Sequence, residues 1–153
     1  MKKNVLKEAK KAVRCMKGKI NAENIVGYIQ SMGYVVLFYD PKKEHPIQKM
    51  YKWLDYAKDK RGFTAVCRHE KYVFINEEYD FFTQLHTLAH EAGHVTLKHL
   101  EGHGIRNKAE EEMEAETFAY ILLNFPRKCF VRKILSLIID IKERLMAGSV
   151  AYE

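Results

Sequence analysis

The feature that most constrains the fold is an amphipathic helix predicted to run from Asp80 to about Leu100. Its apolar residues recur at helical spacing and form one stripe: Phe81, Leu85, Leu88, Ala92 and Val95. His90 and His94 lie on the opposite side of this helix. We therefore expect the stripe to face the core and the histidines to face a second surface that another segment covers. Gly93 has no side chain and would let that segment approach closely.

Local signals predict the remaining elements. The predicted helices span residues 4–17, 21–32, 109–124 and 128–147, with mixed helical character over 46–59; the predicted strands span 34–39, 63–68 and 72–76. Asn21 is the expected N-cap of the second helix and Gly33 its stop, and Pro126 is expected to end the helix over 109–124. Strand 34–39 is predicted to be buried. Because helices, a small sheet and further helices follow one another without βαβ alternation, the predicted class is α+β.

The composition fits one intracellular domain over residues 1–153. Lys and Arg outnumber Asp and Glu by 26 to 20, giving a net charge of +6. Three widely spaced cysteines, Cys15, Cys67 and Cys129, form no C-x-x-C pair and make a disulfide framework improbable, which favours a cytoplasmic location. The first residues lack the apolar core of a secretory signal, and the longest apolar stretch, 134–141, is far shorter than the ~20 residues of a membrane span.

Residues 90–94 match the pattern H-E-x-x-H. Two imidazoles four residues apart on a helix are one turn apart and can reach the same zinc ion. Glu91 projects about 100° away from His90, where a carboxylate can accept a proton from an attacking water. The plainer reading is that His90 and His94 are two exposed helical histidines. The helical placement and the acidic segment that follows favour the metal site.

The neighbouring histidines are expected to have other roles. His86 shares the face of His90 and His94, but about 12 Å of helix separates it from His94. We therefore expect His86 to contact one of the metal-binding residues, to face the substrate or to be exposed. His99 falls on the apolar stripe and is predicted to be structural. The pattern H-E-x-x-H-x-x-G-x-x-H is excluded, because leucines stand at positions 97 and 100.

A catalytic zinc normally takes three protein ligands, and residues 109–123 offer five carboxylates. Helical phase places Glu111 and Glu114 on the predicted buried face and Glu110 at its margin, and it directs Glu112 and Glu116 away. A buried carboxylate is costly unless it is paired or bound to metal, so Glu111 and Glu114 are the candidates for the third ligand. The alternative is a solvated helix start, where the helix dipole favours acids.

Two segments, Leu88-Ala-His-Glu-Ala-Gly-His94 and Glu114-Ala-Glu-Thr-Phe-Ala119, resemble the ImmA/IrrE metallopeptidase family, and the resemblance covers about residues 72–126. It implies a zincin-like domain in which a small three-stranded sheet packs with the H-E-x-x-H helix and a following glutamate helix. By this match Glu114 is the third zinc ligand, beside His90 and His94, as in gluzincins. The chain departs from the family pattern at Leu85-His86, where Arg-Phe is common, and at Glu116, where the family has Asn.

The predicted function is that of a zinc-dependent endopeptidase with Glu91 as general base and His90, His94 and Glu114 as zinc ligands. The resemblance implies a protein substrate, a helix-turn-helix repressor of a phage or mobile element. We expect a substrate strand to pair with strand 63–68 or 72–76, and Tyr120, His103 and His86 are weak candidates for the donor to the carbonyl oxygen. The alternatives are a non-proteolytic zinc-containing module that binds a regulator or nucleic acid, and a DNA-associated zincin of the SprT kind, which would usually bring more cysteines. The positive charge permits nucleic-acid binding but does not require it.

Overall fold

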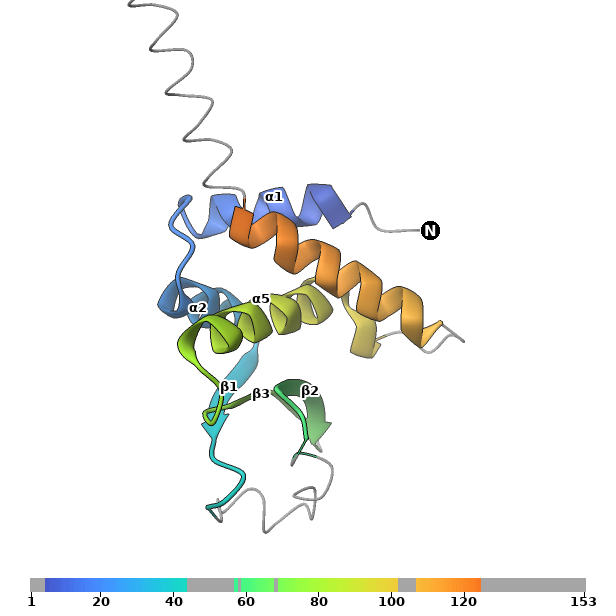
Figure 1. Ribbon diagram of the computed structural model, residues 1–153. Helices are drawn as coiled ribbons and strands as arrows, with labels where there is room; N and C mark the ends of the chain where they lie inside the picture. Colours follow the sequence, from blue (N-terminus) through green and yellow to red (C-terminus); the bar gives the residue numbers. More distant parts are fainter. Residues whose placement is uncertain (1–4, 44–56, 58, 68, 102–106, 125–153) are drawn as a thin grey trace, which may run out of the picture. The chain divides into compact units, whose positions relative to one another are not determined.

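The computed structural model describes residues 5–43, 57, 59–67, 69–101 and 107–124 (Figure 1). The predicted helix over 128–147, Pro126 and nearly all of the predicted helical segment 46–59 lie outside these residues. Contacts within the chain divide it into residues 1–123 and 124–153. The description below concerns the first of these two units, and a single domain over residues 1–153 stays a prediction.

The order of elements is that of an α+β protein, as predicted. Helices α1 (Val5–Cys15) and α2 (Ala22–Ser31) come first and are followed by strands β1 (Tyr34–Tyr39), β2 (Gly62–Cys67) and β3 (Glu70–Asn76). Helix α5 (Phe81–Leu97) and the short 3-10 helix η1 (His99–Glu101) follow. Residues 108–124 are helical as well, and we call them the glutamate helix.

Side-chain caps begin two of the helices where the sequence predicts them. The Asn21 side chain accepts a hydrogen bond from the backbone N–H of Asn24 at 2.8 Å and starts α2. The carboxylate of Asp80 accepts hydrogen bonds from the backbone N–H groups of Phe82 and Thr83 and starts α5. Gly33 follows α2 with φ of +84°, a conformation that glycine adopts without strain. These local signals fix where the chain turns into the sheet and out of it.

The three strands form a mixed sheet in the order β1-β3-β2. Strand β3 is central, parallel to β1 and antiparallel to β2, and Val73 to Asn76 at its end are all buried. The prediction of a buried strand over 34–39 is only partly right, because β1 lies at an edge among the described strands, and Val35 and Phe38 on it are exposed. A strand with a neighbour on one side only keeps part of its surface in contact with solvent.

The sheet buries two different faces. On one face a cluster forms around Tyr39, Tyr72 and Phe74, with Phe63 stacked on Phe74 at a centroid distance of 4.8 Å. The other face of β3, which carries Val73 and Ile75, lies on the side of α5. Helix α5 therefore has the sheet on one side.

The glutamate helix lies on the other side of α5 (Figure 1). A Cβ atom built on Gly93 would come within 3.0 Å of the Cα and the carbonyl oxygen of Ala115, so the two helices touch backbone to backbone. On the sheet side, a Cβ on Gly62 would meet the Thr87 side chain at 2.5 Å. The predicted close approach at Gly93 is confirmed, and α5 is held tightly between its two neighbours.

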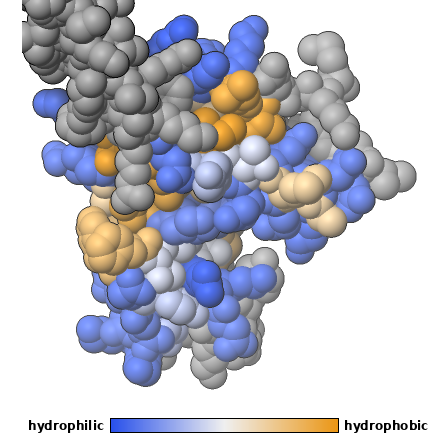
Figure 2. Space-filling model, turned by 45° about the horizontal axis from the view of Figure 1, so that its top comes forward, coloured by the Kyte–Doolittle hydropathy of each residue, from blue (hydrophilic) through white to orange (hydrophobic). Residues whose placement is uncertain are grey.

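The predicted apolar stripe of α5 is correct at Leu88, Ala92 and Val95, which are buried, and wrong at Phe81, which is 60% exposed. Phe82, the next residue of the first turn, is exposed as well. Figure 2 shows a largely hydrophilic face of the molecule on which hydrophobic residues form separate, smaller patches. Among the described residues, no helix has the length and the hydropathy needed to cross a membrane.

Candidate metal centre

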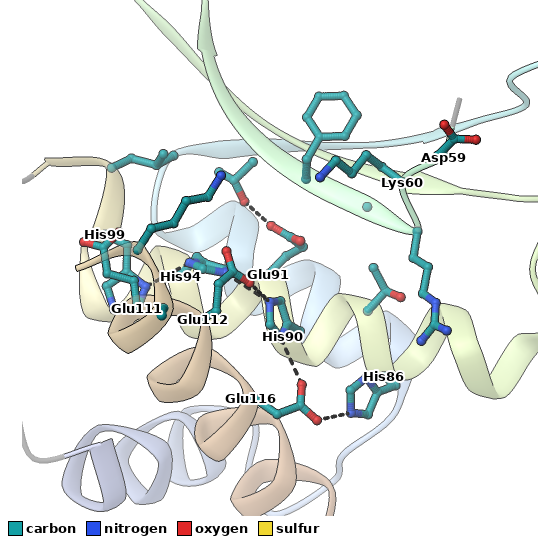
Figure 3. Close-up of a pocket in the computed structure, with 18 residues that line it drawn as sticks. Asp59, Lys60, His86, His90, Glu91, His94, His99, Glu111, Glu112 and Glu116 are labelled. Atoms are coloured by element: carbon teal, nitrogen blue, oxygen red, sulfur yellow. Dashed lines mark hydrogen bonds and ion pairs between the residues drawn. The ribbon is translucent and has the colours of Figure 1, made fainter. Parts of the chain in front are cut away.

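His90 and His94 converge with Glu112 on one point between α5 and the glutamate helix (Figure 3). The Nε2 atoms of the two imidazoles are 3.0 Å apart. One oxygen of Glu112, Oε2, lies 3.3 Å from Nε2 of His90 and 3.7 Å from Nε2 of His94. Within the described part of the chain, these three side chains are the group that could hold a metal ion.

The spacing of the three atoms fits a tetrahedral metal site. Ligand atoms that each bond zinc at roughly 2.0–2.1 Å lie about 3.3 Å from one another in a tetrahedral shell. The distances of 3.0, 3.3 and 3.7 Å scatter around that value. Burial lowers the pKa of His94 to about 4, and the electrostatic effect of nearby His90, which is smaller, acts in the same direction. The imidazole of His94 is therefore neutral at neutral pH, as a metal ligand must be.

Glu91 lies beside this group but points toward the sheet. Its side chain is buried, with 5% of the residue exposed, and accepts a hydrogen bond of 2.6 Å from the hydroxyl of Thr64 on β2. Burial raises the pKa of Glu91 to about 7, although the Thr64 hydrogen bond acts in the opposite direction. A carboxyl group with a pKa near neutrality can both accept and release a proton, which is the requirement for general acid–base catalysis.

The carboxylates of the glutamate helix are arranged differently from the sequence prediction. A cleft opens between β2, α5 and the glutamate helix. Glu114, predicted as the third ligand, places its Oε2 3.3 Å from Nε2 of His99 and is not among the residues that line this cleft. Glu111 lines the cleft but is not part of the group that could hold an ion. Glu112 and Glu116 do point away from the core, as predicted, and are more than half exposed.

Glu112, and not Glu114, lies next to His90 and His94 because the histidines of α5 lie beside the exposed flank of the glutamate helix. Its buried face carries Ala115, Phe118, Ala119 and Leu122, which serve the core. A metal site that must admit a substrate opens to solvent, so a carboxylate at the boundary between core and solvent can reach it. The geometry therefore favours Glu112, and the assignment of Glu114 as a ligand stays a prediction.

His86 and Glu116 form a second layer around His90. Glu116 bridges two histidines: its Oε2 lies 3.1 Å from Nδ1 of His90 and its Oε1 lies 3.1 Å from Nε2 of His86 (Figure 3). His86 thus contacts a partner of the predicted ligand His90, and its role stays a prediction. Carboxylates at the second nitrogen of a ligating imidazole orient the ring and increase its basicity.

His99 is buried, but it is not on α5. The helix ends at Leu97, and Lys98 adopts a left-handed conformation with φ of +58°. This turn brings Nδ1 of His99 to 2.8 Å from Nδ1 of His94. The structural role predicted for His99 therefore includes direct contact with a predicted ligand.

Thr64 is a residue of the site that the sequence does not single out, because nothing in a strand sequence shows which helix residue its hydroxyl meets.

The three candidates for the donor to the substrate's carbonyl oxygen differ in where they lie. His86 lines the cleft, Tyr120 is not among its lining residues, and His103 lies outside the described residues.

Two imidazoles and a carboxylate around one point, next to a buried glutamate on the same helix, define a metal-dependent hydrolase of the H-E-x-x-H type. The family model described as the IrrE N-terminal-like domain, peptidase family M78, matches residues 42–145. The chain therefore belongs to the ImmA/IrrE family of metallopeptidases, and membership implies peptidase activity on a protein substrate. No significant match to a curated protein or to a solved structure was found.

Proposed function

We propose that this protein is a zinc-dependent endopeptidase in which His90, His94 and Glu112 hold the metal and Glu91 is the general base. The observation that carries the proposal is the position of Glu91, which is buried and hydrogen-bonded to Thr64 next to the three convergent ligand atoms. A purely structural metal site has no use for a buried carboxyl group of this kind. Neutral imidazole nitrogens and one carboxylate are also the ligands that zinc takes in catalytic sites.

The chemistry divides between the ion and the side chains. A zinc ion at this point would polarise the scissile carbonyl group and make the attacking water more acidic. Glu91 accepts a proton from that water as its oxygen attacks the carbonyl carbon. Glu91 then donates the proton to the amide nitrogen as the C–N bond breaks, leaving a carboxyl product and an amine product. The hydroxyl of Thr64 holds the Glu91 carboxylate in place during both transfers.

The substrate segment is expected to lie along β2. Of the two strands considered from the sequence, residues 72–76 belong to β3, which is central and has neighbours on both sides. Strand β2 has one neighbour among the described strands, and Gly62, Phe63 and Thr64 line the cleft. An extended peptide that adds to this edge passes beside Glu91 and the metal ligands.

The proposed substrate is a helix-turn-helix repressor. This proposal derives from the family resemblance, and the net charge of +6 would suit an acidic segment of such a partner. A cytoplasmic location goes with a substrate of that kind.

The decisive experiment is cleavage of the repressor encoded next to this gene by the purified, zinc-loaded protein, with the products mapped by mass spectrometry. Wild-type protein should cut one bond, and a chelator should stop the reaction. Glu91→Gln should bind zinc as wild type does and cut nothing. Glu110→Gln is the matched control, because it removes a carboxylate that is not among the cleft-lining residues. Cleavage by Glu91→Gln at the wild-type rate would refute the mechanism.

The same experiment distinguishes a peptidase from the non-proteolytic binding module. A binding module would form a stable complex with the repressor and leave it intact in wild type and in Glu91→Gln alike. A complex that dissociates after cleavage in wild type, and that persists in Glu91→Gln, is the result expected of a peptidase.

A further inference from the structure

Helix α1 presents one face that carries positive charge along the helix. Residues 5–19 contain six Lys or Arg residues and a single acid, Glu8. Because an α-helix turns by about 100° per residue, the exposed cations of α1 fall within an arc of roughly 100°. They are Lys7, Lys10, Lys11 and Arg14. These four residues, which we call the cationic face, form a row that extends roughly 10 Å along the helix axis.

The opposite face of α1 attaches the helix to the core. Ala9, Ala12 and Val13 are buried, and α1 packs against α5. Among the described residues that line the cleft, none belongs to α1. A ligand bound to the cationic face would therefore leave the cleft and the candidate metal centre open.

Little negative charge within α1 balances the cationic face. Glu8 is the one acid of the helix, and its Oε2 lies 3.9 Å from Nζ of Lys11, a long distance for an ion pair. Lys7 and Lys11 are four residues apart, and so are Lys10 and Arg14. Like charges at this spacing repel each other and destabilise a helix. Anions bound along the face would reduce that repulsion.

We propose that the cationic face of α1 binds the phosphate backbone of double-stranded DNA, independently of the base sequence. The duplex carries one negative charge for about every 1.7 Å of its axis, so a row of roughly 10 Å faces several phosphates. Lysine and arginine side chains are common donors to phosphate oxygens. The inference goes beyond the proposed function and does not depend on it, because the face contains none of the residues proposed for the metal site or for the chemistry.

The composition and burial of α1 favour duplex DNA over other anionic partners. The helix contains no aromatic residue, whereas proteins that bind single strands stack the bases on aromatic side chains. A helix that binds a membrane surface inserts an apolar face into the lipid, but the apolar face of α1 is buried in the protein. A continuous row of cations also suits the regular phosphates of DNA better than the irregularly placed carboxylates of an acidic protein.

The test measures the binding of a fluorescein-labelled duplex to the metal-free protein by fluorescence anisotropy over a series of salt concentrations. Wild type should bind, and log Kd should rise with log salt with a slope of roughly 3–4, as expected for four phosphate contacts. Lys10→Gln/Lys11→Gln removes two contacts, so the slope should fall by about 2 and the affinity at about 50 mM salt by about ten-fold or more. Lys10→Arg/Lys11→Arg keeps both charges and should bind like wild type.

Lys42→Gln/Lys43→Gln is the matched control, because it removes the same charge from two exposed lysines outside α1. Nζ of Lys42 lies 2.5 Å from Oε1 of Glu78, and Nζ of Lys43 lies 3.0 Å from Oδ2 of Asp40, so both lysines already have anionic partners. This control should bind DNA with the affinity and the salt dependence of wild type. Thermal unfolding checks that every variant folds.

Absence of binding by wild type at about 50 mM salt would overturn the proposal, and so would an equal loss in the two glutamine variants. Polyglutamate that displaces the duplex as effectively as unlabelled DNA would assign the face to an acidic protein instead. Tighter binding to vesicles of anionic phospholipid than to the duplex would assign it to a membrane. The proposed function is tested separately, because Glu91→Gln should bind DNA like wild type. A protein that binds DNA as expected and cuts no repressor would contradict the proposed function and support this inference.

Discussion

Gly93 of α5 lies against the backbone of Ala115 in the glutamate helix, at a distance that leaves no room for a side chain. Three residues before Ala115, Glu112 reaches the space between His90 and His94. The separation of the two helices at Gly93 therefore determines whether the carboxylate and the imidazoles meet. The metal centre depends on a contact that includes no ligand atom.

Gly93→Ala should consequently destabilise the protein and weaken zinc binding. Alanine is favoured over glycine inside a helix by up to about 1 kcal/mol. At Gly93 this gain is outweighed, because the new Cβ would lie 3.0 Å from two backbone atoms of Ala115. We expect a lower melting temperature and at least a ten-fold loss of zinc affinity, measured by thermal unfolding and chelator competition.

Gly27→Ala in α2 is the matched control for that prediction. A Cβ on Gly27 would meet nothing within 4 Å, so this substitution should keep or raise the melting temperature and leave zinc affinity unchanged. A Gly93→Ala protein as stable as Gly27→Ala would show that the two helices can separate without cost.

Glu112→Gln and Glu114→Gln should differ in zinc affinity. Glu112 contributes an oxygen to the convergent group, so its loss should weaken zinc binding by more than the ~10–100-fold typical of an outer partner. Glu114 contacts His99, so its loss should stay within or below that range. Both dissociation constants can be measured with the same chelator. The reverse order would establish Glu114 as the ligand, as the sequence resemblance implies.

Glu112 and Glu114 show what the sequence can predict about this site and what it cannot. Helical phase correctly separates core-facing Ala115 and Phe118 from outward-facing Glu112. Helical phase does not show which element lies beside the outward flank of the glutamate helix, because that depends on how α5 packs against it. Capping signals at Asn21 and Asp80 succeed because they act within a few residues of the chain.

His99 illustrates a second limit. An apolar stripe continued past Leu97 predicts that His99 lies on the helix, but Lys98 turns the chain in a left-handed conformation. Glycine would have signalled such a turn, and lysine does not. The contact between His94 and His99 is therefore visible only in three dimensions.

Thr64→Val should impair catalysis more than binding. Valine has nearly the shape of threonine but has no hydroxyl, so buried Glu91 would lose the hydrogen bond that orients it. Loss of a hydrogen bond to a charged group costs roughly 1.5–3 kcal/mol, so we expect kcat to fall by about ten-fold or more. KM and zinc content should change little. Thr64→Ser keeps the hydroxyl and should retain most of the activity, and equal rates for Val and Ser would remove Thr64 from the mechanism.

Asp80 should make the stability of the protein depend on pH. Hydrogen bonds from the side chain and backbone of Thr83, and from the backbone of Phe82, lower the pKa of Asp80. The unfolded chain has the ordinary value of about 4. The cap therefore stabilises the folded state fully above that pH, and the benefit is lost as the pH falls through the lower, folded value. The melting temperatures of wild type and Asp80→Ala should differ most near pH 7 and converge in acid. Asp80→Asn keeps an acceptor without the charge and should show a smaller change with pH.

Two positions without a side chain, Gly62 and Gly93, fix α5 against its neighbours on opposite sides. No missense change at either codon is conservative, since each of the other amino acids adds at least the one carbon for which there is no space. In a saturation mutagenesis screen scored on proteolysis, both glycines should therefore tolerate substitution as poorly as His90 and His94, the histidines proposed to bind the metal. The cause would be the lack of space between packed elements and not a role of either glycine in the reaction.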